Sequence, residues 1–122
     1  MSVFTAAELI YLQTERRLAR LATVGPDGTP HVTPVGWSLN TTDQVIEITG
    51  INLARTKKFR DIARTHRAAI IIDDVLPPWQ PRGIEIRGHA EAITDPEPLI
   101  RIHPERIIAW GLDGRHNART IR

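Results

Sequence analysis

Six basic residues within a thirteen-residue segment form the most concentrated chemical feature of this 122-residue sequence. Residues 55–67 contain one acid, Asp61, and the basic residues Arg55, Lys57, Lys58, Arg60, Arg64 and Arg67. The segment has a net charge of +5, whereas the other residues, ten basic and thirteen acidic, sum to −3. Both lysines of the chain lie in this segment. The positive charge is thus concentrated in one segment of an otherwise mildly acidic chain, a distribution that a general nucleic-acid binder would not be expected to have.

The spacing of apolar residues places these cations on a helix. Phe59, Ile62 and Ala63 follow the i, i+3, i+4 pattern of a buried helical face. Asn52 is a suitable N-cap, so we expect a helix over residues 52–64. The side chains beside its first turn are Arg55, Thr56, Lys57 and Lys58. The free amides and the positive dipole end of such a turn favour a phosphate group as the anion.

From spacing alone, two interpretations of this helix remain open. In the first, the N-terminal amides, one hydroxyl and the two lysines form a phosphate site. In the second, the helix presents a solvated basic face on which Lys57 pairs with Asp61 four residues later. Such a pair contributes only about 0.3 kcal/mol to stability. The spacing favours neither interpretation over the other.

The other reactive side chains give little support for a site. Cysteine is absent, which excludes disulfides, thiolate metal ligands and cysteine nucleophiles. None of the five histidines forms an i, i+4 pair or a His-Glu-x-x-His motif, so we expect no metal site. Neither Ser2 nor Ser38 lies in a nucleophile-elbow motif. We assign no catalytic residue and expect that, in an enzyme, a bound cofactor supplies the reactive atom.

The composition also bears on macromolecular partners. Aromatic residues make up 5% of the chain and only Phe59 lies near the basic segment, so stacking platforms for nucleic acid are scarce. There is no stretch of about 18 apolar residues and no charged, apolar leader at the N-terminus. We therefore expect a cytoplasmic protein that binds neither nucleic acid nor a membrane.

A meander of antiparallel strands is expected to carry the basic helix. The six strands indicated by apolar patterning span residues 17–24, 31–39, 44–49, 68–72, 83–92 and 99–110. An N-terminal helix opens with the capping-box pair Thr5 and Glu8, and Pro104 is expected to bend the last strand. Only the third and fourth strands have a helix between them, which favours a small antiparallel barrel. We expect one domain over residues 1–112 and a tail, residues 113–122, that is loose or ordered only against a partner.

Each of the three tryptophans has a structural and a ligand-binding interpretation. Trp37 lies in a predicted strand and is expected in the core or in an interface between subunits. Trp79 stands in a proline-rich loop, either as a lid over a pocket or as a surface residue. Trp110 ends the last strand, where it either stacks on a planar ligand or closes the core. Without further information, the structural interpretation is the simpler one for all three.

Four segments resemble, in order, the pyridoxamine 5′-phosphate oxidase-like (PPOX class) FMN/deazaflavin-binding split β-barrel family. Residues 20–36, RLATVGPDGTPHVTPVG, resemble its first hairpin, and residues 53–61, LARTKKFRD, resemble its cofactor-phosphate helix. Residues 81–88, PRGIEIRG, resemble its fifth strand, and residues 102–112, IHPERIIAWGL, resemble its closing strand. The branch that the chain resembles most consists of small coenzyme F-420-dependent oxidoreductases.

The resemblance implies a mostly β protein, a homodimer of six-stranded antiparallel split β-barrels with cofactor sites at the subunit interface. It implies an oxidoreductase that transfers hydride between a deazaflavin, coenzyme F-420, and a small-molecule substrate. The alternatives are an FMN-dependent oxidoreductase or FMN-binding protein, and a carrier of flavin or deazaflavin without turnover. The C-terminal substrate-phosphate motif of true pyridoxamine phosphate oxidases is absent, so oxidation of vitamin B6 is not expected.

The resemblance also assigns residues to the cofactor site. The residues that it places on the cofactor phosphate are Arg55, Thr56, Lys57 and Lys58. Those that it places along the ring and its side chain are Thr49 and the backbone of Thr33, Pro34 and Val35. Trp110 of the second subunit helps to wall the pocket, and Trp79 is a further candidate for the same wall. No proton donor, metal ligand or physiological substrate is assigned.

Overall fold

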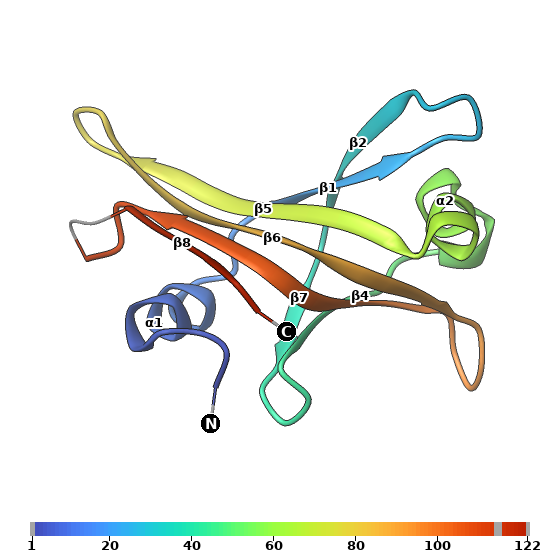
Figure 1. The fold of residues 1–122 in the computed structure, drawn as a ribbon, viewed down its shortest axis with the longest axis horizontal. Helices are drawn as coiled ribbons and strands as arrows, with labels where there is room; N and C mark the ends of the chain where they lie inside the picture. The colour runs from blue at the N-terminus through green and yellow to red at the C-terminus, as the bar shows by residue number, and fades with distance from the viewer. Residues whose placement is uncertain (1, 114–115, 122) are drawn as a thin grey trace.

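The chain folds into one curled antiparallel sheet with a helix near each end (Figure 1). The computed structural model describes residues 2–113 and 116–121. Its helical elements are α1 (Ala6–Thr14), the 3₁₀ turn η1 (Leu53–Arg55) and α2 (Lys57–Thr65). Its strands are β1 (Ala19–Val24), β2 (Pro30–Val35), β3 (Ser38–Asn40), β4 (Val45–Ile48), β5 (Arg67–Leu76), β6 (Gln80–Ile93), β7 (Leu99–Trp110) and β8 (His116–Thr120). The expected mostly β, antiparallel class is confirmed, with eight strands in the described residues where six were expected.

The single strand expected over residues 31–39 is wrong. It is two strands, β2 and β3, separated by Gly36 and Trp37. The Trp37 side chain is buried and its Nε1 donates a hydrogen bond to the carbonyl oxygen of Arg17 at 2.6 Å. Trp37 therefore lies in the core, and the alternation of buried and exposed residues continues from Val35 to Ser38 although the strand pairing is interrupted.

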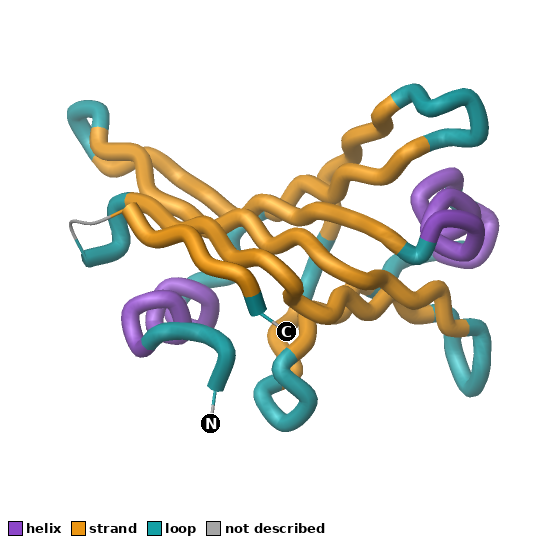
Figure 2. The backbone as a smooth tube through the Cα atoms, viewed as in Figure 1, coloured by secondary structure: helices purple, strands orange, loops and turns teal. Residues whose placement is uncertain are grey.

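The order of strands explains why the sheet curls. Along the sheet the order is β2-β1-β5-β6-β7-β4-β3, so β2 and β3 are its two edges. These edges are joined by Gly36 and Trp37 alone, which brings them together at one end. The first half of β7 pairs with β4 and its second half with β8. The result is a small barrel, and the tube in Figure 2 shows α1 and α2 outside it at opposite ends.

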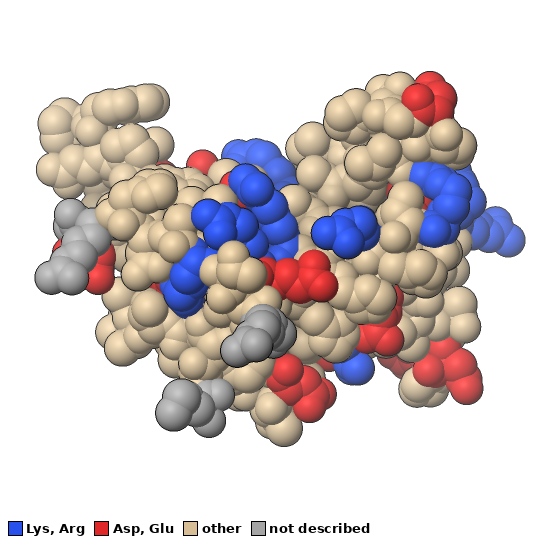
Figure 3. Space-filling view, in the orientation of Figure 1, with Lys and Arg blue, Asp and Glu red and all other residues tan. Residues whose placement is uncertain are grey.

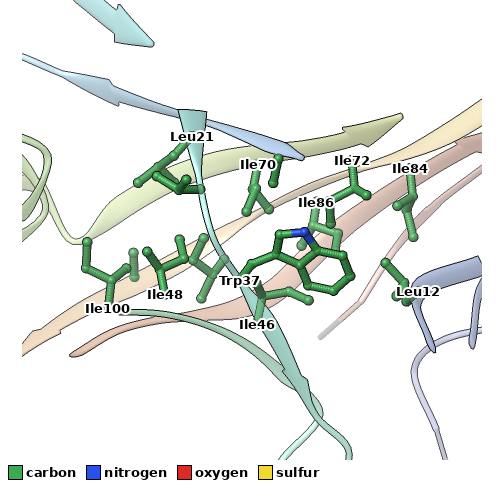
Figure 4. Packing of buried hydrophobic residues seen from close by; sticks show 14 of the residues in the cluster. Leu12, Leu21, Trp37, Ile46, Ile48, Ile70, Ile72, Ile84, Ile86 and Ile100 are labelled. Carbon is green, nitrogen blue, oxygen red and sulfur yellow. The ribbon is translucent and has the colours of Figure 1, made fainter. Parts of the chain in front are cut away.

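The inner face of the sheet forms an isoleucine-rich core. In β6, Ile84, Ile86 and Ala90 are buried whereas Arg87 and His89 are exposed, which is the alternation of a strand with one face on the core. Figure 4 shows inward side chains of several strands gathered around the Trp37 ring, with Leu12 of α1 approaching from one side. No helix in the described residues is long and apolar enough to span a bilayer. Because the interior is occupied by side chains, a ligand must bind on the outer face or at the ends of the sheet.

A bulge bends the pairing of β6 with β7 where Pro104 was expected to bend the chain. Between Arg87 and Gly88 the register with β7 shifts by one residue, opposite Pro104. A Cβ on Gly88 would lie 1.9 Å from the carbonyl oxygen of His103, so the close approach of the two strands requires glycine. The bulge increases the local twist and lets these long strands follow the barrel.

Residues 116–120 of the C-terminal tail pair with β7 of the same chain. These residues form β8, which contradicts the expectation of a loose tail. Arg119 of β8 donates to the Glu8 carboxylate of α1 at 2.6 and 2.8 Å, and Glu8 is 1% exposed. The same carboxylate accepts from the Thr5 amide at 3.0 Å in the expected capping box. A buried carboxylate requires a cation, and this requirement holds β8 beside α1.

Replacing Arg119 with alanine is expected to lower the free energy of unfolding by about 3 kcal/mol, because the buried Glu8 carboxylate loses its cation. Urea denaturation followed by circular dichroism measures the change. The control is Arg87→Ala, which breaks a pair between the half-exposed Arg87 side chain and Glu85 and is expected to cost less than about 1 kcal/mol. Equal losses in the two variants would contradict this role for Arg119.

Candidate functional site

The helix that carries both lysines begins at Lys57, later than expected. Asn52 has a left-handed φ of 53° and makes no side-chain cap, because it forms the turn into η1. The N-cap is Thr56, whose hydroxyl accepts from the Phe59 amide at 3.3 Å and donates to the Leu53 carbonyl oxygen at 2.7 Å. The expected start at Asn52 is therefore wrong. The correction places Lys57 and Lys58 in the first two helical positions, among the free amides.

A buried carboxylate lies beneath these lysines. Asp61 of α2 is 1% exposed. Its Oδ2 accepts from the Thr23 hydroxyl of β1 at 2.9 Å, and its Oδ1 accepts from Lys57 Nζ at 3.2 Å and from Arg64 at 3.4 Å. Arg64 also donates to the carbonyl oxygen of Val24, at the end of β1. These bonds fix α2 against β1 and determine where its first turn lies.

Asp61 carries a negative charge at neutral pH. Burial by itself would raise its pKa, but the hydrogen bonds from Thr23 and Lys57 and the charge of Lys57 outweigh burial and lower the pKa below its ordinary value. The three charged groups Lys57, Asp61 and Arg64 thus sum to a single positive charge. The basic segment is less positive at this point than its sequence indicates.

Lys57 lies between α2 and the β1–β2 hairpin. A Cβ on Gly25, in that hairpin, would be 2.9 Å from Lys57 Nζ. The interpretation of α2 as a solvated basic face required a pair between Lys57 and Asp61. That pair is present, but Asp61 is buried rather than solvated. The Lys57 side chain keeps 42% exposure, so it has N–H groups available to a ligand. Lys58 is half-buried and Arg55 exposed, and neither makes a salt bridge within the described residues.

The residues expected along the cofactor ring do not share one face. Val35 is buried in the core, so its backbone alone is available to a ligand. Thr33 is half-buried and Pro34 exposed, both on the edge strand β2. Thr49 lies just after β4 and lines, with Arg55, an open hollow of about 430 Å³ beside η1. Thr49 and Arg55 thus lie close together. Thr33 and Pro34 belong to β2, which pairs with β1, and β1 in turn contacts α2.

The turn between β5 and β6, which contains Trp79, and the end of β7, which is Trp110, lie away from α2 (Figure 1). The ten residues of β5 run from the end of α2 to the turn with Trp79, a length of about 33 Å. Trp79 is 75% exposed. Trp110 pairs with Gly83 of β6, and a Cβ there would be 2.8 Å from its ring. One chain therefore does not bring either tryptophan to the lysines.

A second charged cluster fixes the end of the sheet that carries Trp79. Asp74 lies within β5, which extends beyond the strand expected over residues 68–72. It accepts hydrogen bonds from the Tyr11 hydroxyl at 2.8 Å, from Arg82 at 2.8 Å and from Arg17 at 3.3 Å. The bonds from Arg82 above all hold the pKa of Asp74 well below its usual range, while burial and Asp74 raise the pKa of Tyr11. The cluster joins α1, β5 and β6.

A groove of about 560 Å³, which the sequence did not reveal, is lined by several strands of the sheet. Its small lining residues are Ala22, Ala68, Ala69 and Gly88. Its charged lining residues are Arg67, Arg87, Glu105 and Arg106. Figure 3 shows Lys and Arg side chains gathered over the middle of the sheet and again beside α2. The alternation of residues 83–92 indicated that Arg87 faces outward, but the strand order that joins the other residues to it was not available from the sequence.

Three histidines that are distant in the sequence lie next to one another. The ring centroids of His66 and His89 are 5.9 Å apart, and those of His89 and His103 are 5.8 Å apart. His103 also makes a 2.5 Å hydrogen bond with Glu91. In residues 2–113 and 116–121, no group of His, Asp and Glu side chains has an arrangement that could hold a metal ion.

Comparison with known proteins gives a family match over nearly the whole chain. Residues 6–120 match the family model described as pyridoxamine 5′-phosphate oxidase. The chain is also 38% identical, over 122 residues, to the 5a,11a-dehydrotetracycline/5a,11a-dehydrooxytetracycline reductase of Streptomyces rimosus subsp. rimosus. That alignment covers 91% of this chain and 85% of the relative. The matched residues include every residue discussed above for a cofactor.

Two solved structures share the fold at lower sequence identity. A heme-binding protein from Mycobacterium smegmatis has a TM-score of 0.74 at 18% identity, covering 98% of this chain and 60% of that one. A protein described as an F420 reductase has a TM-score of 0.62 at 22% identity, covering 80% of this chain and 94% of that one. At these identities the likeness establishes the fold alone, so the ligand must be argued from the site.

The charge of Asp61 is expected to make stability depend on pH. Because its pKa is lower in the folded than in the unfolded chain, its contribution is present above about pH 4 and is lost as the pH falls below that value. We expect Asp61→Asn to lower the free energy of unfolding by about 2 kcal/mol at neutral pH, with a smaller difference from wild type at about pH 3. Urea denaturation over a pH series measures this. A difference that is the same at every pH would contradict the assignment.

Proposed function

Because the chain belongs to the pyridoxamine 5′-phosphate oxidase family, we propose that it is an oxidoreductase that transfers hydride between coenzyme F-420, a deazaflavin, and a small organic substrate. The 38% identity to a protein named as a reductase supports this class of reaction. The observation that carries the cofactor proposal is the start of α2, where both lysines lie among free main-chain amides. FMN is the alternative cofactor, because the same cations suit its phosphate.

The donors at the start of α2 fit a phosphate ester. Lys58 and Arg55 have no competing salt bridge within the described residues, and the Lys57 side chain is 42% exposed although it is paired with Asp61. The amides of the first turn of α2 supply further donors. The Thr56 hydroxyl already donates to Leu53 and accepts from the backbone, so we assign it to capping the helix. The phosphate is then bound by cations and amides at one end of the sheet.

The remaining parts of the site orient the ring. Thr33 and Pro34, on the exposed edge strand β2, and Thr49, beside Arg55, are proposed to line the ring and its side chain. A bound deazaflavin supplies the carbon that accepts or donates the hydride. The chain's own residues then position the two reactants and exclude water, which is the contribution that a hydride transfer requires from a protein.

We also propose that the active form is a homodimer. Trp79 lies beyond the ten residues of β5, about 33 Å from the end of α2, and Trp110 lies level with Asp73, about 20 Å along β5, so neither is placed to wall a cofactor bound at the start of α2 in the same chain. In a pair of chains related by a two-fold axis, the tryptophan end of one sheet can meet the α2 end of the other. Trp110 of one subunit would then complete the site at Lys58 of its partner.

The groove on the sheet is proposed to take part in binding the substrate. Its volume of about 560 Å³ lies in the range of sites for drug-sized molecules. Small lining residues such as Ala22 and Ala69 leave room for a flat ring system, and Arg67 and Arg106 offer donors to its oxygen atoms. The relative from Streptomyces rimosus is named for dehydrotetracyclines, which are conjugated ring systems with several oxygen atoms. We propose a conjugated cyclic ketone or quinone as the substrate class.

The purified protein is titrated with F-420 and with FMN, and binding is measured by cofactor fluorescence. We expect micromolar or tighter binding of at least one of the two cofactors. Lys58→Ala is expected to weaken binding of the phosphate-bearing cofactor by about tenfold or more, because it removes one cation from the phosphate. Arg16→Ala, which removes an exposed cation between α1 and β1, is the control and is expected to have no effect. Binding of neither cofactor would overturn the proposal.

A turnover assay separates an enzyme from a carrier. Reduced F-420 is expected to be consumed with at least one member of a panel of quinones, nitro compounds and conjugated ketones. Tight cofactor binding with no consumption across the panel would contradict an oxidoreductase and favour the carrier.

Mixing two variants that each bind cofactor weakly tests the shared site. Lys58→Ala and Trp110→Ala are each expected to bind cofactor weakly, because each removes one part of every site. In a mixed dimer, one site has an intact Lys58 and receives an intact Trp110 from the other subunit. Unfolding and refolding the two variants together is therefore expected to restore tight binding to part of the sites. No restoration, with dimers demonstrated by ultracentrifugation, would contradict a site built from two chains.

A further inference from the structure

The buried acid Asp61 lies beside the lysines of the proposed phosphate site and affects how strongly phosphates of different charge bind there. Asp61 lies 3.2 Å from Lys57 Nζ and 3.4 Å from Arg64, so two cations of the basic segment are already paired with it. We infer that Asp61 is a specificity-determining residue that favours a phosphodiester, with one negative charge, over a phosphomonoester, with two. This inference rests on the proposed function, since it concerns the phosphate bound at the start of α2.

The two candidate cofactors, FMN and coenzyme F-420, differ in the charge of their phosphate. FMN ends in a phosphomonoester, which has a second ionisation near pH 6 and carries nearly two charges at neutral pH. In coenzyme F-420 the phosphate joins the ribityl chain to the acidic tail, so it is a diester with one charge. The two phosphates can occupy the same position, but they respond differently to a fixed charge nearby.

The distances make Asp61 such a fixed charge. A phosphate oxygen bound to Lys57 at about 2.8 Å places the phosphorus within about 8 Å of the Asp61 carboxylate. That separation is close to the screening length of physiological salt, and a pair that includes a buried group is screened less than an exposed pair. Asp61 is 1% exposed. Its repulsion therefore acts on every unit of phosphate charge and counts twice against the dianion.

The cations around the site keep it attractive to either phosphate. Lys58, Arg55 and Arg60 lie within the same segment and are not among the residues bonded to Asp61. Asp61 thus weakens the binding of a doubly charged phosphate more than that of a singly charged one, and the site still binds anions. A tail with carboxylates, as in F-420, can still use the exposed cations farther along the segment.

Asparagine at this position would remove the charge of Asp61 while keeping a side chain that can form hydrogen bonds. Asparagine has nearly the same size, and its oxygen can accept from Lys57 while its amide donates to the Thr23 hydroxyl. The geometry of α2 against β1 can therefore be kept by a neutral side chain. What the aspartate adds is its charge, and the charge faces the side chain of Lys57.

The test compares three ligands on wild type and Asp61→Asn by fluorescence titration: F-420, FMN and riboflavin, which has no phosphate. Removing the charge is expected to shift the ratio of FMN to F-420 affinity toward FMN by about fivefold and to leave riboflavin affinity unchanged. Asp43→Asn, which removes an exposed acid in the β3–β4 turn, is the control and is expected to keep the wild-type ratio. An unchanged ratio in Asp61→Asn would overturn the inference.

Partial or complete unfolding of a variant does not prevent the test. The ratio of two affinities measured on one sample does not depend on the folded fraction. If Asp61→Asn does not fold, the double variant Lys57→Gln/Asp61→Asn is compared with Lys57→Gln alone. The double variant is expected to show a ratio shifted toward FMN relative to Lys57→Gln, and equal ratios in these two variants would overturn the inference. Wild type that binds neither F-420 nor FMN would instead overturn the proposed function.

Discussion

The location of the proposed cofactor site depends on one buried carboxylate. Asp61 receives hydrogen bonds from Thr23 of β1 and from Lys57 and Arg64 of its own helix. A buried anion that lost these donors would cost several kcal/mol, so α2 cannot move along the hairpin without a large penalty. The first turn of α2, with its free amides and Lys58, is therefore held in one place at the end of the sheet.

The two ends of the sheet have different chemistry, which is why we propose a site that two chains share. The α2 end is basic, whereas the other end carries Trp79 and Trp110 and is fixed by the cluster around Asp74. Isoleucines fill the space between the faces of the curled sheet, so a planar cofactor has to lie outside the barrel. In the proposed dimer, a second copy turned end for end would bring the aromatic end to the basic end without any change within either chain.

Local signals in the sequence were enough for the class of the fold and for several elements. The capping box at Thr5, the alternation along β6 and the bend near Pro104 each depend on neighbours within a few residues. Other features depend on distant partners: β8 is ordered by Arg119, which bonds Glu8 across 111 positions. The basic segment was recognised, but the burial of its one acid depends on β1, and spacing alone could not distinguish a buried pair from a solvated one.

The central claim is that the cofactor phosphate lies at the start of α2, and the composition of the chain allows a direct test. The protein has two lysines, both in that turn, so labelling lysine with ¹³C at Cε gives NMR signals from the proposed site alone. The signals of Lys57 and Lys58 are followed while F-420 is added. The account predicts that both shift and reach saturation together with cofactor fluorescence. Bound cofactor with unshifted lysine signals would contradict it.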